Sequence, residues 1–243
     1  MNLNKLAFRN IFRRKRRTLI TTFSIAFGVM LAVTFTGTGD YTYTNMIDTG
    51  AKMGMGHVTV QPLDYQNKPT LDKRLQHTPQ LLKDIFAQEG VADAVPRIMG
   101  QAMFASANKS VGGVFIAIDP DKEQATSNLF IKSMVQGKVF GATSKRGIVI
   151  GSKLAKKLKL KLGKKLVYTT TDIEGEIISH IARVTGIFTT GVNIIDGAMV
   201  LLPLKSTQKY LGYRTDEVTL IAVMIKDQRK AQDMRDLLAV LPI

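Results

Sequence analysis

The residues best suited to chemistry in this sequence are two methionines and a histidine at alternate positions. Met53, Met55 and His57 offer the soft sulfur and imidazole ligands that Cu(I) prefers. Gly54 and Gly56 separate them, and the same stretch also reads as a flexible hinge in which the glycines are the important residues and methionine is filler. The hinge is the interpretation that we favour, and we expect no metal site.

No other pattern in the chain predicts a catalytic or cofactor site. The histidines His57, His77 and His180 are far apart in sequence, and none has a local partner at metal-ligand spacing. Residues 163–165 (Gly-Lys-Lys) lack the first glycine and the hydroxyl of a phosphate-binding loop, so we do not expect the chain to bind ATP. There is no G-x-S-x-G or H-E-x-x-H, and no cysteine for a disulfide or thiolate site. We therefore predict a protein that is not an enzyme and has no cofactor.

The net charge of +15 is concentrated in two segments. Residues 145–165 contain nine Lys and Arg and no acid, and outside this segment and the N-terminus the charges nearly balance. This distribution argues against a nucleic-acid-binding protein. The lysines around 153–162 could meet anionic lipid or an acidic partner. We favour a solvated helix face, with Leu154, Leu158 and Leu162 packed inward.

The first forty residues predict a membrane helix. Residues 18–39 are 22 positions without an ionisable side chain. As a helix they span about 33 Å, close to the roughly 30 Å of a hydrocarbon core. A cleaved signal peptide is the alternative, but its apolar region is shorter and ends in small residues that are missing here. The basic residues before the span predict a cytoplasmic N-terminus and an extracytoplasmic main domain. Those closest to the span are Arg13, Arg14, Lys15, Arg16 and Arg17.

The sequence predicts two further features of this N-terminal segment. Residues 3–14 alternate apolar and basic side chains at helical spacing, which indicates a short amphipathic helix on the cytoplasmic face of the bilayer, although any basic flank can look similar. Within the span, Ser24, Gly28 and Ala32 form a stripe of small residues that lets two helices approach closely. Because small residues are common in membrane helices, the stripe could also be incidental; we favour a packing face.

Beyond the span, residues 40–56 predict a helical stalk that ends between Gly50 and Gly56. Alternating or apolar runs then predict an α+β domain, with a middle section near residues 121–184 whose sequence pattern differs from that of the rest. The expected strands are 57–61, 94–105, 111–118, 147–151, 165–171, 176–188, 197–202 and 218–225. The expected helices are 79–90, 152–162 (closed by Gly163), 203–211 and 227–240.

Two sequence blocks then carry a resemblance to a known family. The first is G-x-x-L-A-x-x-L-x-L-x-x-G, matched by Gly151, Leu154, Ala155, Leu158, Leu160 and Gly163. The second is V-x-G-I-F-x-T-G…D…P-L, matched by Val184, Gly186, Ile187, Phe188, Thr190, Gly191, Asp196, Pro203 and Leu204. With the basic elbow and the span before them, the chain resembles the N-terminal half of an ABC transporter permease of the MacB/LolC/LolE/FtsX-like group.

This resemblance implies a domain organisation. It consists of a cytoplasmic elbow (1–17), a transmembrane helix (18–39), a stalk (40–56), a porter-like α+β lobe (57–120 and 185–243) and an inserted β-rich lobe (121–184). Such permeases continue with three more spans and a coupling element for the ATPase, so we expect the chain to be a fragment or a natural half.

The resemblance also implies a role and partners. The expected role is to couple ATP hydrolysis on a separate ATPase subunit to extracytoplasmic movement that exports or extracts a lipoprotein, lipid or peptide. The expected partners are the bilayer, the ATPase, a second permease subunit as homo- or heterodimer, and a lipoprotein or periplasmic protein, but no nucleic acid. The expected location is the bacterial inner membrane. The alternative is a stand-alone membrane-anchored periplasmic adaptor or sensor.

Overall fold

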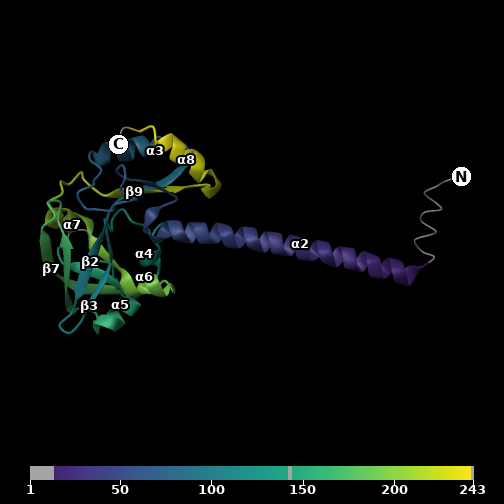
Figure 1. Cartoon of the computed structure of the whole chain (residues 1–243), viewed down its shortest axis with the longest axis horizontal. Helices are drawn as coiled ribbons and strands as arrows, with labels where there is room; N and C mark the ends of the chain where they lie inside the picture. The colour runs from purple at the N-terminus through teal and green to yellow at the C-terminus, as the bar shows by residue number, and fades with distance from the viewer. Residues whose placement is uncertain (1–13, 142–143, 242–243) are drawn as a thin grey trace. The chain divides into compact units, whose positions relative to one another are not determined.

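The structure is a computed structural model that describes residues 14–141 and 144–241 (Figure 1). It divides into two compact units, residues 1–46 and residues 47–243, and each is described by itself. Arg13 and residues 1–12 of the expected elbow lie outside the described residues, and only residues 14–17 of the elbow are described. The first unit consists of most of helix α2 (Lys15–Gly50). Among the described residues, α2 with the π-helical turn after it is the one helix long and apolar enough to cross a membrane.

Helix α2 satisfies several of its own hydroxyl groups. The side-chain oxygens of Thr21, Ser24, Thr34 and Thr36 each donate to the carbonyl four residues earlier, at 2.8–3.0 Å. An unpaired hydroxyl in hydrocarbon is costly, and this back-bonding removes the cost without a partner helix. These four hydroxyls are therefore compatible with lipid and do not by themselves require a neighbour.

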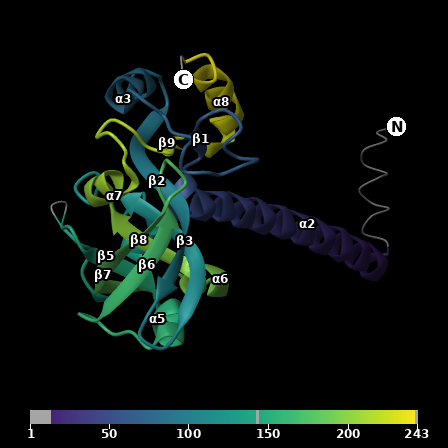
Figure 2. The ribbon, with the colours of Figure 1, turned by 60° about the vertical axis from the view of Figure 1, so that its left-hand side comes forward.

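The second unit is built on a nine-stranded mixed sheet, with spatial order β1-β9-β2-β3-β8-β5-β7-β4 and β6 paired with both β2 and β7. The strands are β1 Val58–Val60, β2 Val91–Ala105, β3 Ser110–Ile118, β4 Met134–Gly137, β5 Gly147–Gly151, β6 Lys165–Thr171, β7 Ile177–Phe188, β8 Met199–Pro203 and β9 Leu220–Ile225. Because β6 joins β2 to β7, the pairing closes a ring β2-β3-β8-β5-β7-β6 (Figure 2).

Strand β2 belongs to both parts of this sheet. Its first half, Val91–Arg97, pairs with β9, and its second half pairs with β3 and β6. Helix α3 (Thr78–Phe86) packs on β2, and α8 (Ala231–Leu238) packs on β1 at the same end of the domain (Figures 1 and 2). The remaining helices, α4 (Leu129–Lys132), α5 (Ser152–Leu158), α6 (Asn193–Ala198) and α7 (Leu204–Leu211), contact the ring strands or the stalk.

The structure is an α+β fold with one apolar N-terminal helix, as the sequence predicts. The division into lobes remains a prediction, and the strand pairing runs across its expected boundary at residues 184 and 185. Strand β5, in the expected insertion, pairs with β8, which was assigned to the porter-like lobe. The ring therefore contains residues from both expected lobes.

The expected helix over 152–162 is wrong in its second half. Helix α5 ends at Leu158 because Lys159 adopts the left-handed conformation (φ 53°), and the Leu160 N–H returns to the Ala155 carbonyl at 2.8 Å. This reversal turns Leu160 into the core and leaves Leu162 41% exposed. The inward face therefore consists of Leu154, Leu158 and Leu160 rather than Leu162.

Candidate functional site at the stalk junction

The stalk junction, residues 48–57, is where the long helix enters the folded domain. Helix α2 ends at Gly50 and passes into a π-helical turn, Ala51–Met55, that contacts β1, β9 and α4. Within this turn Gly54 has φ 126°, and Gly56 just after it has φ 76°. Both values are unfavourable for any residue with a Cβ atom. The expected end of the stalk between Gly50 and Gly56 therefore has a defined geometry, which departs from a helix at Gly54 and again at Gly56.

Close packing also restricts both positions to glycine. A Cβ atom on Gly54 would lie 2.6 Å from Cδ1 of Ile116, and one on Gly56 would lie 2.7 Å from the backbone N and O of Val223. The Gly56 N–H donates to the Ala51 carbonyl at 2.9 Å, which closes the turn. The two glycines are thus fixed against the core, and the interpretation of this stretch as a flexible hinge needs correction: the turn is bent but tightly packed.

A small polar cluster surrounds the junction. Lys52 Nζ lies 2.7 Å from Asp48 Oδ2, and His57 Nε2 lies 3.7 Å from Asp48 Oδ1. The His57 N–H donates to the Val223 carbonyl, while His57 Nδ1 accepts from the Ile225 N–H at 3.4 Å. Since Nδ1 acts as an acceptor, the neutral ring carries its proton on Nε2, facing Asp48. Burial lowers the pKa of His57; Asp48 opposes this shift and Lys52 adds to it.

The copper hypothesis gains no support from this geometry. His57 directs one nitrogen to a backbone N–H and the other to a carboxylate. Met53 packs against a core cluster that includes Ile116 and Phe130, whereas Met55 is exposed. In the described part of the chain, no group of three or more His, Cys, Asp or Glu side chains is placed to hold a metal ion. The contacts of His57 are suited to fixing the backbone of the stalk junction against β9.

A buried ion pair lies beneath the junction. Arg97 on β2 donates from Nε and Nη2 to the two carboxylate oxygens of Glu123, at 2.6 and 2.7 Å, and both side chains are buried. Asn128 Nδ2 donates to Glu123 at 3.0 Å, and its Oδ1 caps α4 by accepting from the N–H groups of Phe130 and Ile131. The network therefore joins β2 to α4.

The same network borders the π-helical turn. A Cβ atom on Gly54 would lie 4.0 Å from Nη1 of Arg97, and α4 contacts the turn directly. Nη1 is buried, and no hydrogen-bond partner for it occurs within residues 14–141 and 144–241. Arg97, Glu123 and Asn128 were not identified from the sequence, because 26 residues separate the two charges and only the fold brings them together.

The family-block residues meet at a second place, between β5 and α6. Gly151 at the end of β5 lies so close to the Asp196 backbone that a Cβ atom would overlap its carbonyl. The Asp196 carboxylate accepts from the Thr190 N–H and hydroxyl, both at 2.8 Å, and from the Gly191 N–H at 3.2 Å. Gly191 has φ 87°. These residues form a packed corner of the domain and no reactive site.

The other family-block residues have separate structural positions. Gly186 on β7 faces Met134 and the Lys138 backbone, and Gly163 has φ 78° in the turn before β6. Leu154 is buried on α5, and Pro203 precedes α7. All three residues of the small-residue stripe are exposed on α2, as are Lys15, Arg16 and Arg17, and Arg14 is exposed just before the helix. Their expected roles in topology and helix packing remain predictions.

An apolar helix long enough for a bilayer, followed by a large α+β domain, is typical of membrane-anchored proteins with a domain outside the membrane. The particular family follows from a family model, the MacB-like periplasmic core domain, which matches residues 18–240. The chain belongs to this family, and is the MacB-like periplasmic domain region of an ABC transporter permease.

Two solved structures are similar to this chain. One is the extracellular domain of the noncanonic ABC-type transporter YknZ from Gram-positive bacteria (16% identity, 73% of this chain and 88% of that chain, TM-score 0.47). The other is the periplasmic region of MacB from Actinobacillus actinomycetemcomitans (13% identity, 74% and 80%, TM-score 0.49). No curated protein matches the sequence.

Proposed function

We propose that the chain is the part of a permease subunit that passes movement from the membrane to the extracytoplasmic domain. ATP hydrolysis on a separate ATPase subunit moves the membrane helices, and the domain moves with them to export or extract a lipoprotein, lipid or peptide. The N-terminus is cytoplasmic, and the membrane is the bacterial inner membrane. A second permease subunit packs on α2 along Ser24, Gly28 and Ala32.

The observation that carries this proposal is the construction of the stalk junction. A flexible linker of glycine and serine would isolate the domain from movements of its anchor. Here a continuous helix leads into a turn whose Gly54 and Gly56 fit closely against Ile116 and the β9 backbone. A closely packed connection of this kind resists independent movement of its two sides. It therefore favours transmission over simple anchoring.

The test uses the chain in its native membrane assembly. The protein contains no cysteine, so a spin label at Leu63→Cys in the domain and a second one on the lipid headgroups report one distance, the height of the domain above the membrane. We expect an ABC ATPase to co-purify and the distance distribution to differ between ATP-bound and ADP-bound states. Inserting Gly-Gly after Thr49 should abolish this difference, whereas the same insertion after Ala107, in the β2–β3 turn, should preserve it.

The alternative, a stand-alone adaptor or sensor, predicts a different result. It requires no ATPase in the purified assembly and a label distance that is independent of nucleotide. A nucleotide response that survives the insertion after Thr49 would contradict the proposed role of the stalk junction.

A further inference from the structure

The segment that contains α6 exposes apolar side chains beside the stalk junction. Ile194 is 81% exposed and Val192 is 42% exposed. The next residue, Ile195, points inward and packs against the same core cluster as Met53 of the π-helical turn. Helix α6 and the π-helical turn at the end of the stalk therefore share one packing cluster.

The exposed side chains are held in place. The buried Asp196 carboxylate fixes the Thr190–Gly191 backbone by three hydrogen bonds, and the Asp196 N–H donates to the Val192 carbonyl at 2.9 Å. Ordering the loop before any contact forms lowers the entropic cost of that contact. An apolar side chain that is held in a fixed position while exposed to water is stronger evidence for a binding surface than one on a mobile loop.

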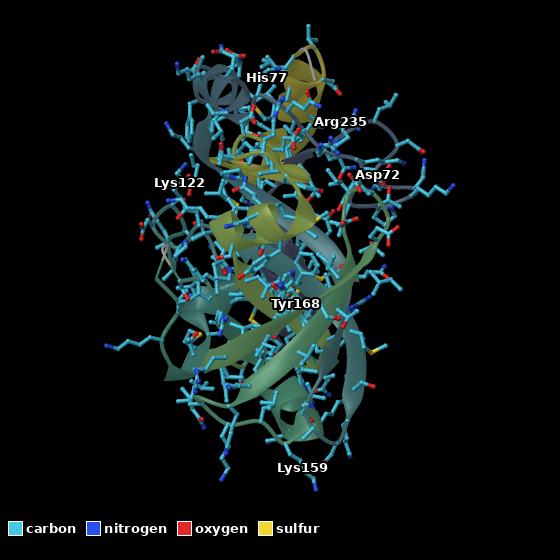
Figure 3. All side chains as sticks on the ribbon, turned by 90° about the vertical axis from the view of Figure 1, so that its left-hand side faces the viewer. Asp72, His77, Lys122, Lys159, Tyr168 and Arg235 are labelled. Atoms are coloured by element: carbon cyan, nitrogen blue, oxygen red, sulfur yellow. The ribbon has the colours of Figure 1, made fainter. Side chains whose placement is uncertain are left out.

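Lysines from α5 flank this apolar tip. Helix α5 packs on α6, and a Cβ atom on Gly197 would lie 3.4 Å from Lys157 Nζ and 4.0 Å from Lys153 Cβ. Both lysines are exposed, and the basic segment continues through Lys159, which projects from the end of the domain opposite His77 and Arg235 (Figure 3). With no acid between residues 145 and 165, these charges are not neutralised along the chain.

The length of the stalk limits how far the junction can lie from the bilayer. Residues 40–50 continue α2 beyond the uncharged run, and as a helix they are about 17 Å long. The headgroup layer takes up roughly 5–8 Å of that length. The junction is therefore no more than about 12 Å beyond the headgroups, a gap comparable with a Debye length of about 8 Å plus a lysine side chain.

We propose that the α6 tip (Val192 and Ile194) and the α5 lysines (Lys153 and Lys157) form a contact surface for anionic phospholipid headgroups of the membrane that α2 crosses. Basic side chains around an exposed apolar residue are typical of segments that bind the interface of an anionic bilayer. The proposal rests on the membrane anchoring of the chain and not on its role in transport, so the two can fail separately.

The experiment uses the full chain in nanodiscs and again exploits the absence of cysteine. An environment-sensitive fluorophore is attached at Ile194→Cys, and contact is measured as quenching by lipids that carry a nitroxide. The control is the same label at Leu63→Cys, which is 94% exposed in the loop after β1. We expect quenching at residue 194 in phosphatidylglycerol-containing discs, little in pure phosphatidylcholine discs, and little at residue 63 in either.

Charge variants test the electrostatic part. Each lysine near an anionic surface strengthens binding about fivefold, so Lys153→Gln with Lys157→Gln should lower the ratio of membrane-bound to free tip roughly 30-fold. Unchanged thermal unfolding would establish that these exposed substitutions leave the fold intact. Equal quenching at residues 194 and 63 would overturn the proposal, as would quenching independent of lipid charge. Protection of the label by soluble polyglutamate, without lipid quenching, would instead indicate an acidic protein partner and also overturn it.

Discussion

Removing one member of the buried Arg97–Glu123 pair should destabilise the domain far more than removing both. In Arg97→Met the Glu123 carboxylate remains buried without its bidentate partner, and in Glu123→Leu the guanidinium is stranded in the same way. Breaking a buried pair from one side costs about 3–5 kcal/mol. Each single variant should therefore lose a large part of a typical stability of about 5–15 kcal/mol.

The double variant removes both charges together. Its remaining cost comes mainly from Asn128 Nδ2, which loses its acceptor and is left buried, a loss of about 1–3 kcal/mol. The double-mutant cycle should thus give a coupling energy of at least about 3 kcal/mol between residues 97 and 123. An exposed pair supplies the matched control: Arg235 lies 2.6 Å from Asp236 with both side chains more than half exposed, so Arg235→Met should cost less than about 1 kcal/mol.

The assay is urea unfolding of the full chain in detergent, followed by tyrosine fluorescence because the sequence has no tryptophan. If the unfolding free energy of every variant depends on urea concentration with the same slope, the variants differ in stability alone. Additive losses, with the double variant as unstable as the sum of the singles, would refute the assignment of Arg97 and Glu123 as a mutually compensating buried pair.

Three further predictions concern single residues. Gly56→Ala should lower the free energy of unfolding by about 2–4 kcal/mol, since it combines positive φ with a backbone overlap. Gly175→Ala, at φ 85° with no atom nearby, should lower it by about 1 kcal/mol in the same urea assay. Equal losses would contradict the packing argument. Leu160→Ala should cost about 2–5 kcal/mol and Leu162→Ala less than about 1 kcal/mol, and the reverse order would restore the longer helix. Because burial lowers the pKa of His57, the unfolded chain binds its proton more readily. The contribution of His57 to stability should be constant above about pH 6.5 and fall as the pH drops toward the folded pKa. Unfolding curves at pH 7.5 and 5.5 measure this loss, and His57→Gln should reduce it. A loss that is unchanged in His57→Gln would contradict the assignment to His57.

The elements that the sequence predicted well are those whose signal is local. Apolar runs such as 147–151 and the alternating residues of 165–171 became strands within a residue of their expected limits. The short elements α4, β4 and α6 were not predicted, since four to six residues carry no readable period. Gly163 was a reasonable stop for the helix after β5, but the chain reverses earlier, at Lys159, where no residue type signals the left-handed conformation.

The stalk junction was only half visible in the sequence. Gly54 and Gly56 marked its position, because such backbone angles need glycine. Their neighbours Ile116 and Val223 come from distant strands, so the sequence could not distinguish a loose hinge from a packed turn. The Arg97–Glu123 pair was invisible for the same reason, and the join between β5 and β8 depends on a pairing that no local pattern specifies.

The closed ring β2-β3-β8-β5-β7-β6 limits how another polypeptide can attach to this domain. An exposed sheet edge invites an incoming strand, both for recognition and for aggregation, but within the ring each strand already has neighbours on both sides. In the described part of the chain the sheet ends at β1 and β4, which are three and four residues long. Ring strands keep a free edge only where their pairing stops short, as at residues 177–182 of β7, which pair with β6 alone. Strand addition is therefore limited to such short segments and the two sheet ends, and elsewhere a partner must recognise side chains and loops.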